Sequence, residues 1–175
     1  MDFPIISSLI ILPTIGALFI LFTKSSNSKY QSNKYVALFI SLANFILSIY
    51  LWLIFDKSSI NFQFVENREW LSGFINYKVG VDGISILFIL LTTFITPICI
   101  ISVISTIKHR LKDFLIAILI METLMIGVFC SLDLIIFYLF FEGGLIPMFL
   151  IIGIWGGERR VYSAFKFFLY TCLLY

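Results

Sequence analysis

The sequence contains few charged residues and lacks the motifs of nucleotide-binding proteins. Only 13% of its 175 residues are Asp, Glu, Lys or Arg, whereas roughly a quarter are charged in a typical soluble domain. The net charge of +2 gives no strongly basic field, so nucleic acid is not expected as a partner. Neither a GxGxxG loop nor a Walker loop occurs. These absences argue against a soluble domain that binds nucleotides.

The chain also has few residues that could form disulfides or bind metals. Its three cysteines, Cys99, Cys130 and Cys172, fall inside apolar runs and show no CxxC spacing. The single histidine, His109, lies in a basic loop. We therefore expect neither a disulfide framework nor a metal site, and no cofactor bound by this chain.

Apolar residues make up 61% of the chain and occur in runs long enough to cross a bilayer. The sequence therefore predicts an all-α membrane protein, a polytopic bundle of about six transmembrane helices in a single membrane domain over residues 1–175. At 15 residues the sixth run is short, and we expect the chain to be a truncated piece of a longer protein. The expected helices span residues 3–23, 36–55, 84–107, 114–131, 134–155 and 161–175.

The distribution of Lys and Arg predicts the orientation of the bundle. The first, third and fifth loops (residues 24–34, 108–113 and 156–160) contain eight Lys or Arg, and the outer segments contain three. Since basic loops stay on the cytoplasmic or matrix side, the N-terminus is expected outside. The long outer loop 56–83 spaces aromatic residues among polar ones, which fits a hairpin or a stretch lying at the membrane interface.

Two acidic residues stand inside otherwise uncharged spans, Glu122 in the fourth and Glu142 in the fifth. A charged side chain at the centre of a membrane helix costs at least about 2.5–3.5 kcal/mol, so such residues are functional candidates. The alternative is a protonated glutamate that only holds helices together. Each lies ten residues from Leu132, in the short turn between the spans, so both are expected at a similar depth, roughly 15 Å from the turn. The count does not show whether they face each other.

Lys166 is a third charge within a predicted span, the sixth. It could snorkel toward the nearby arginines of the fifth loop, or it could take part in a proton relay with the two glutamates. Gly143, Gly144 and Pro147 follow Glu142 closely and are expected to loosen or kink that helix, which would admit water or a partner side chain.

Four stretches of this sequence closely resemble one family. They are Gly80-Val-Asp-Gly-Ile-Ser-Ile-Leu-Phe, Phe137-Tyr-Leu-Phe-Phe-Glu142-Gly-Gly-Leu-Ile-Pro147-Met, Trp155-Gly-Gly and Lys166-Phe-Phe-Leu-Tyr-Thr171. They resemble the chain M family (chain 4 in mitochondria) of respiratory complex I, the proton-pumping NADH–quinone oxidoreductase. The resemblance is densest from Lys78 to Thr171.

The resemblance implies a fold, a function and partners. The family has an antiporter-like fold of about fourteen helices, of which this chain would be the first third. It is a membrane-arm subunit that contributes to proton translocation coupled to electron transfer from NADH to quinone. Glu142 matches the family's fifth-helix glutamate, Glu122 its fourth-helix acid and Lys166 its sixth-helix lysine. NADH, FMN, iron–sulfur clusters and quinone would be used by the whole complex, and the expected partners are neighbouring antiporter-like chains and the lipid bilayer.

One departure from the family pattern is the ending Cys172-Leu-Leu-Tyr175, where the family usually continues Leu-Leu-Gly-Ser. The seventh-helix lysine that pairs with the match of Glu142 is absent, so we expect the piece alone to be inactive. The alternatives are a subunit of a Mrp-type cation/proton antiporter and a membrane scaffold without a transport role. The expected location is a bacterial inner membrane, with the mitochondrial inner membrane as the alternative.

Overall fold

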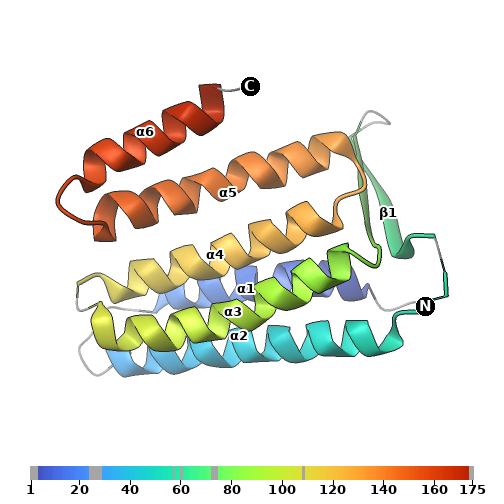
Figure 1. Ribbon diagram of the computed structural model, residues 1–175. Helices are drawn as coiled ribbons and strands as arrows, with labels where there is room; N and C mark the ends of the chain where they lie inside the picture. The colour runs from blue at the N-terminus through green and yellow to red at the C-terminus, as the bar shows by residue number, and fades with distance from the viewer. Residues whose placement is uncertain are drawn as a thin grey trace.

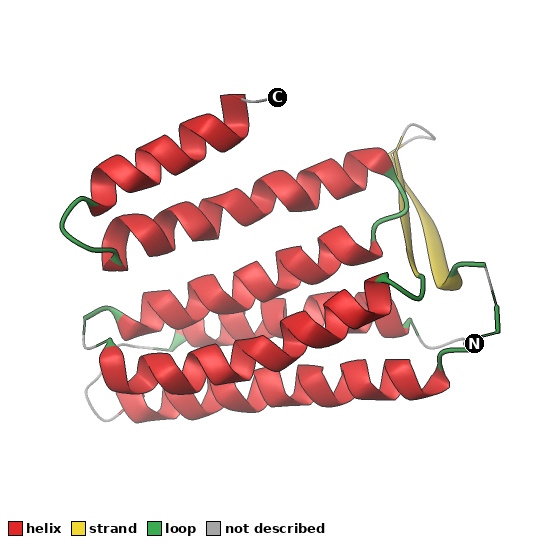
Figure 2. Cartoon of the chain, viewed as in Figure 1, coloured by secondary structure: helices red, strands yellow, loops and turns green. Residues whose placement is uncertain are grey.

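The computed structural model describes residues 4–23, 29–56, 58–59, 61–71, 75–107 and 109–173. The expectations for Phe3, Lys24, Lys108 and for the last two residues fall outside these ranges. Within them the chain forms six helices and one two-stranded sheet (Figures 1 and 2). In chain order the elements are α1 (Ile5–Phe22), α2 (Lys29–Ile54), β1 (Gln63–Leu71), β2 (Ile75–Val81), α3 (Ser85–Thr106), α4 (Leu111–Cys130), α5 (Leu134–Trp155) and α6 (Arg160–Leu173).

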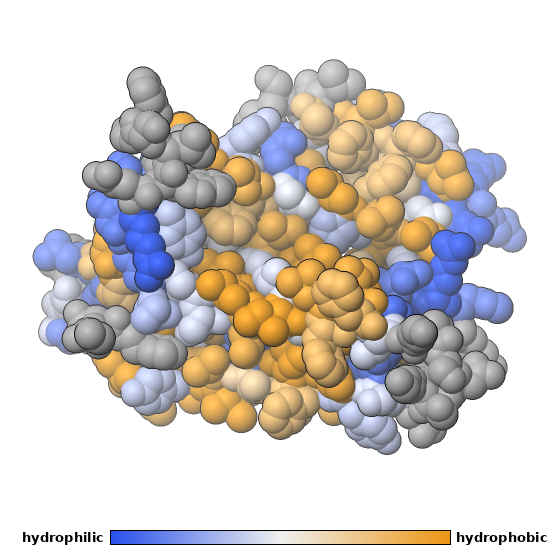
Figure 3. All heavy atoms as spheres, turned by 180° about the vertical axis from the view of Figure 1, so that it is seen from behind, coloured by the Kyte–Doolittle hydropathy of each residue, from blue (hydrophilic) through white to orange (hydrophobic). Residues whose placement is uncertain are grey.

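Five of these helices, α1 to α5, are long and apolar enough to cross a membrane, and α6 has 14 residues. This confirms the predicted class of a mostly helical membrane protein. The largest difference in bounds is at α2, which begins at Lys29 rather than near Val36. Its first turns are polar, so the apolar run alone does not mark where that helix begins. The space-filling view shows the consequence of the composition, an apolar belt between polar ends (Figure 3).

Helices α1 to α4 form a closed four-helix bundle, because α1 packs on α2, α2 on α3, α3 on α4 and α4 on α1. Helix α5 packs on the outside of α4, and α6 packs on α5 (Figure 1). Helix α4 therefore lies at the centre of the molecule. More than half of its residues are buried, whereas only Ile136, Leu145 and Pro147 are buried in α5.

The connections alternate between the two ends of the molecule (Figure 1). The end of α1, the start of α2 and the α3–α4 and α5–α6 connections lie at one end, here called the basic end, which includes Arg110, Lys112, Arg159 and Arg160. The β-hairpin and the α4–α5 turn meet at the other end, the hairpin end. The described basic residues of the third and fifth loops thus lie at the same end, as an alternating set of membrane spans requires.

The outer loop folds into a β-hairpin in which β1 and β2 pair antiparallel, with Gln63 opposite Val81 and Asn67 opposite Lys78. The hairpin attaches to the bundle through Glu66. The Glu66 carboxylate accepts hydrogen bonds from the backbone N–H groups of Ile6 (3.1 Å) and Ser7 (3.2 Å), and another from the Ser7 hydroxyl. These N–H groups lack partners within their own helix, so a strand residue caps the N-terminus of α1.

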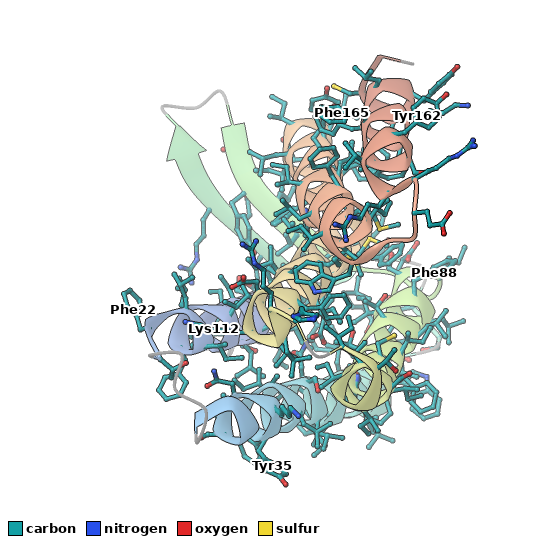
Figure 4. All side chains as sticks on the ribbon, turned by 90° about the vertical axis from the view of Figure 1, so that its left-hand side faces the viewer. Phe22, Tyr35, Phe88, Lys112, Tyr162 and Phe165 are labelled. Atoms are coloured by element: carbon teal, nitrogen blue, oxygen red, sulfur yellow. The ribbon has the colours of Figure 1, made fainter. Side chains whose placement is uncertain are left out.

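The opposite end of α1 is held by a lysine from α4. The Lys112 ammonium donates to the carbonyl oxygens of Leu21 (2.9 Å) and Thr23 (2.7 Å), at the point where the carbonyls of α1 have no helical partner. Figure 4 shows Lys112 beside this end of α1, while the labelled Phe22, Tyr35 and Tyr162 point outward from the bundle. A carboxylate at the N-terminus and an ammonium at the C-terminus both match the sign of the helix dipole.

Candidate functional site

A layer of polar side chains crosses the middle of the α1–α4 bundle. The buried apolar residues form two clusters, one toward the hairpin end and one toward the basic end. In each of the four helices the polar side chains lie in sequence between the residues of these two clusters. This polar layer consists of Thr14, Ser41, Asn44, Ser48, Thr93, Thr96, Glu122 and Thr123.

Glu122 is the only ionisable side chain of the polar layer, and it is 2% exposed. One of its carboxyl oxygens, Oε1, accepts a hydrogen bond of 2.8 Å from the side-chain amide of Asn44, which is itself fully buried in α2. The other oxygen, Oε2, has no hydrogen-bond partner, and neither has Oδ1 of Asn44. Burying a carboxylate with one hydrogen bond and no counter-charge is costly, so this position is unusual for a residue that serves only packing.

Two more hydrogen bonds in the layer join different helices. The hydroxyls of Ser48 in α2 and Thr93 in α3 lie 2.7 Å apart, and those of Thr14 in α1 and Thr123 in α4 lie 3.0 Å apart. With the Asn44–Glu122 bond they connect all four helices at one level. The remaining hydroxyls, for example that of Ser41, bond to carbonyl oxygens of their own helix. The layer therefore holds Glu122 in a defined place.

A groove of about 310 Å³ lies between α3 and α4 and reaches Glu122. Its walls are mostly Phe, Leu, Ile and Met side chains, and its polar lining includes Glu122, Thr92 and Thr96. Phe88 and Leu91 at its rim are half exposed, so the groove opens on the outer surface of α3. The volume suffices for several water molecules, and these three side chains supply hydrogen-bonding groups.

Glu142 lies outside the α1–α4 bundle, whereas Glu122 is buried inside it. Its carboxyl accepts a hydrogen bond of 2.7 Å from the hydroxyl of Tyr138, one turn earlier in α5. Tyr138 and Ile146, which flank Glu142 at four residues on either side, are 48% and 59% exposed. The face of α5 that contacts α4 includes Phe140, Gly143 and Leu145 instead. Glu142 is therefore on the side of α5 that α4 does not cover.

The expected similarity in depth follows from the helix bounds. Glu122 is eight residues before the end of α4 and Glu142 eight residues after the start of α5, so each lies about 12 Å from the hairpin end. Their carboxyl groups nevertheless point to separate surroundings, one to Asn44 inside the bundle and one to Tyr138 outside it. The structure does not bring the two acids together.

Lys166 is exposed on α6, and its ammonium lies 5.8 Å from the centre of the Tyr162 ring and 5.7 Å from that of Tyr170. It is six residues from the start of α6, about 9 Å from the basic end, whereas Glu142 is thirteen residues from the same end of α5, about 20 Å. Lys166 thus sits between two aromatic rings at another depth, and the structure brings it to neither glutamate.

The residues after Glu142 have three different surroundings. A Cβ atom at Gly143 would lie 3.2 Å from Leu124, whereas Gly144 has open space around it. Pro147 is buried, and α5 continues through it. Because proline lacks an N–H, the carbonyl of Gly143 loses its helical hydrogen bond directly next to Glu142. Among the glycines of α4 and α5, the closest approach is at Gly127, which the sequence did not single out: a Cβ atom there would lie 2.6 Å from the ring of Phe140.

Sequence reasoning also missed Asn44, the hydrogen-bond partner of Glu122, and the polar residues near it in α2. Ser41, Asn44 and Ser48 are spaced by three and four residues, which places them on one face of α2. A polar stripe of this kind in an apolar membrane helix is a signal that could have been used, because polar side chains in membrane helices face other helices. The partner helix could not have been read from that stripe.

The described side chains include one buried carboxyl that is suited to binding and releasing a proton. No group of three or more His, Cys, Asp or Glu side chains comes together as a metal site among the residues that the structure describes. A buried carboxyl can bind and release a proton, and it is uncharged whenever the proton is bound. The geometry thus supports a titratable group within the bundle, with a mostly apolar groove beside it that also contains two threonine hydroxyls.

Comparison with known proteins gives matches along the whole chain. The family model described as NADH:quinone oxidoreductase/Mrp antiporter, TM, matches residues 131–174. NADH-quinone oxidoreductase subunit M of Rickettsia prowazekii is 49% identical over 98% of this chain and 35% of the relative. The subunit M of Rhodobacter capsulatus is 56% identical over 82% of this chain and 28% of the relative.

Similar matches come from a mitochondrial relative and a solved structure. NADH-ubiquinone oxidoreductase chain 4 of Arabidopsis thaliana is 48% identical over 96% of this chain and 34% of the relative. A chain in respiratory complex I from Thermus thermophilus with bound NADH superposes with a TM-score of 0.79 at 26% identity, covering 96% of this chain and 33% of that chain. The chain therefore spans about a third of the length of the relatives it matches.

Proposed function

We propose a function for this chain on the premise that it belongs, over about a third of their length, to the family of NADH-quinone oxidoreductase subunit M and its counterpart chain 4. It acts as part of a membrane-arm, antiporter-like subunit and contributes to proton translocation coupled to electron transfer from NADH to quinone. The observation that carries this proposal is the Glu122 carboxyl, buried in the polar layer at mid-membrane depth.

The proposed role of Glu122 follows from the cost of its charge. An ionised carboxylate at this depth is expensive, and a neutral carboxyl is not, so the residue is useful where a proton arrives and leaves. The groove between α3 and α4 offers room for water beside it. Glu122 is therefore proposed to take up a proton and to return it to water in this groove.

Glu142 and Lys166 are proposed to act with groups outside this chain. Glu142 lies on a face of α5 that α4 leaves uncovered, and Lys166 is exposed on α6. Neighbouring antiporter-like subunits of the complex are proposed as partners. NADH, FMN, the iron–sulfur clusters and quinone are proposed to bind to other subunits. The proposed location is a bacterial inner membrane, with the mitochondrial inner membrane as the alternative.

The test compares glutamate-to-glutamine replacements in the native assembly. Glu142→Gln and Glu122→Gln keep the shape of the side chain and remove its dissociable proton, and Glu158→Gln in the exposed α5–α6 loop is the matched control. NADH–quinone turnover and the proton gradient are measured in membranes, with subunit content checked by blot. Glu142→Gln is expected to lower both by on the order of tenfold or more, with a milder loss in Glu122→Gln.

Normal turnover and gradient in both variants would refute the proposed proton carriers. A Mrp-type cation/proton antiporter is the second candidate, because the matching family model includes both types of protein. It predicts proton flux that depends on Na⁺ and needs no NADH. The relatives compared above, at 48–56% identity, are all named as NADH-quinone or NADH-ubiquinone oxidoreductase chains, which favours the first candidate.

A further inference from the structure

The Asn44 amide and the Glu122 carboxyl make one of the two hydrogen bonds that they could form with each other. One bond of 2.8 Å joins Nδ2 of Asn44 to Oε1 of Glu122, and the other oxygen of each group is buried without a partner. An amide and a carboxylic acid can form two hydrogen bonds at once, but only if the acid carries its proton and donates it. The two unpaired atoms belong to the two groups already in contact, and rotation about the terminal torsions of both side chains is soft.

Among the residues that the structure describes, no cation faces Glu122 from the helices around it. The residues Ile5–Phe22 of α1 include no ionisable group, α3 contributes only Cys99 and β2 approaches α4 only at the hairpin end. The ionisable residues of α5, Tyr138 and Glu142, lie on its uncovered face. On α2 and α4 themselves, Tyr50 is six residues from Asn44 and is 54% exposed. The other ionisable residues of these two helices lie at least two turns along the helix from the pair, and they are Lys29, Tyr30, Lys34, Tyr35, Lys112, Asp113 and Cys130. A carboxylate here would have only the Asn44 amide to stabilise it.

We propose that Asn44 is the positioning residue of Glu122: its amide oxygen accepts the carboxyl proton from Oε2 while its N–H donates to Oε1. This inference rests on the proposed function, in which the Glu122 proton is one of those moved. When the O–H bond of Glu122 breaks, the proton passes to water in the α3–α4 groove and the negative charge stays on the carboxylate. Asn44 keeps its N–H donor on Oε1 in that state, so one amide serves both forms of the acid.

The test uses infrared difference spectroscopy on the native assembly during a pH change. The carbonyl stretch of a protonated carboxyl moves to higher frequency when its hydrogen bonds are lost. We expect one carboxyl band that disappears in Glu122→Gln and that moves to higher frequency in Asn44→Leu, which has the shape of asparagine without its polar atoms. Asn33→Leu is the matched control, because Asn33 is also buried in α2 but bonds to Thr23 at the basic end. It should leave the band in place.

Turnover gives the second readout. Asn44→Leu is expected to lower proton-coupled turnover severalfold at unchanged subunit content, and Asn44→Gln, which keeps an amide, to restore part of it. An unmoved band in Asn44→Leu, or a wild-type band at the frequency of a carboxyl free of hydrogen bonds, would overturn the inference even if a variant assembled poorly. Normal turnover in Glu122→Gln with a band that moves in Asn44→Leu would instead refute the role of Glu122 in proton transfer.

Discussion

Replacing Glu66 should weaken the attachment of the β-hairpin to α1, and the loss of local stability can be worked out from its hydrogen bonds. Its carboxylate accepts two backbone N–H groups and one hydroxyl at the start of α1, and Pro4, the residue before that helix, makes no side-chain cap. Loss of a helix cap costs typically about 1 kcal/mol, and each hydrogen bond to a charged group contributes about 1.5–3 kcal/mol. Since Glu66 is half buried and water replaces part of these bonds, we expect Glu66→Ala to cost about 2–4 kcal/mol of local stability.

Hydrogen exchange of the first turn of α1 measures this directly. Since 1.36 kcal/mol corresponds to a factor of ten, exchange of the Ile6 and Ser7 amides should accelerate roughly 30- to 1,000-fold. Asn67→Ala, in the neighbouring exposed position of β1, is the control and should leave exchange unchanged. Exchange at α1 that is equally slow in Glu66→Ala and the control would show that the carboxylate does not hold the hairpin in place.

Two further predictions concern helix contact and pH. Gly127→Ala should destabilise the α4–α5 contact by about 1–3 kcal/mol, because a Cβ atom would meet the Phe140 ring at 2.6 Å. Gly144→Ala is the control: its Cβ atom fills open space, so it should be neutral. The thermal midpoints of the purified assemblies measure the difference. Burial raises the pKa of Tyr77 above its usual value of 10, although the hydrogen bond between Tyr77 and Ser7 lowers it. The neutral form of Tyr77 is therefore favoured in the folded hairpin. Its contribution to folding stability is fully present below about pH 10 and is lost as pH rises through the folded pKa. Tyr77→Phe should remove that alkaline dependence of α1 exchange.

The sequence predicted the helical spans and the alternation of the chain between two ends, because both depend on composition along the chain. Runs of apolar residues near 20 residues long are strong signals, and Lys and Arg concentrate in alternate loops. The membrane orientation stays a prediction. The pairing of β1 with β2 could not be derived, since the outer loop mixes polar and aromatic residues without strict alternation. The cap that Glu66 supplies to α1 joins residues sixty positions apart, which no local pattern indicates.

Which way each glutamate points could not be predicted from the sequence. Depth follows from counting residues at a constant rise, so the similar depths of Glu122 and Glu142 were accessible. Direction requires a helix with one polar face, but α5 is apolar nearly all round and gives no such face. The packing of Gly127 against Phe140 and of Gly143 near Leu124 shows which side of α5 meets α4, and Glu142 lies outside that side. The roles assigned to Glu142, Glu122 and Lys166 stay predictions.

The charges at the helix ends differ from Glu122 in one respect that bears on function. Glu66, Asp82 and Asp133 accept hydrogen bonds at helix N-termini, and Lys112 and Arg160 donate to carbonyls at helix C-termini, so the fold itself accounts for their charge. No helix end accounts in this way for the carboxyl of Glu122, which lies in the middle of α4. A glutamine at position 122 could pair with Asn44 through both an oxygen and an N–H, without any proton to bind and without the risk of a bare charge among apolar helices. The carboxyl therefore adds nothing to packing that an amide would lack; what it adds is a proton that can leave.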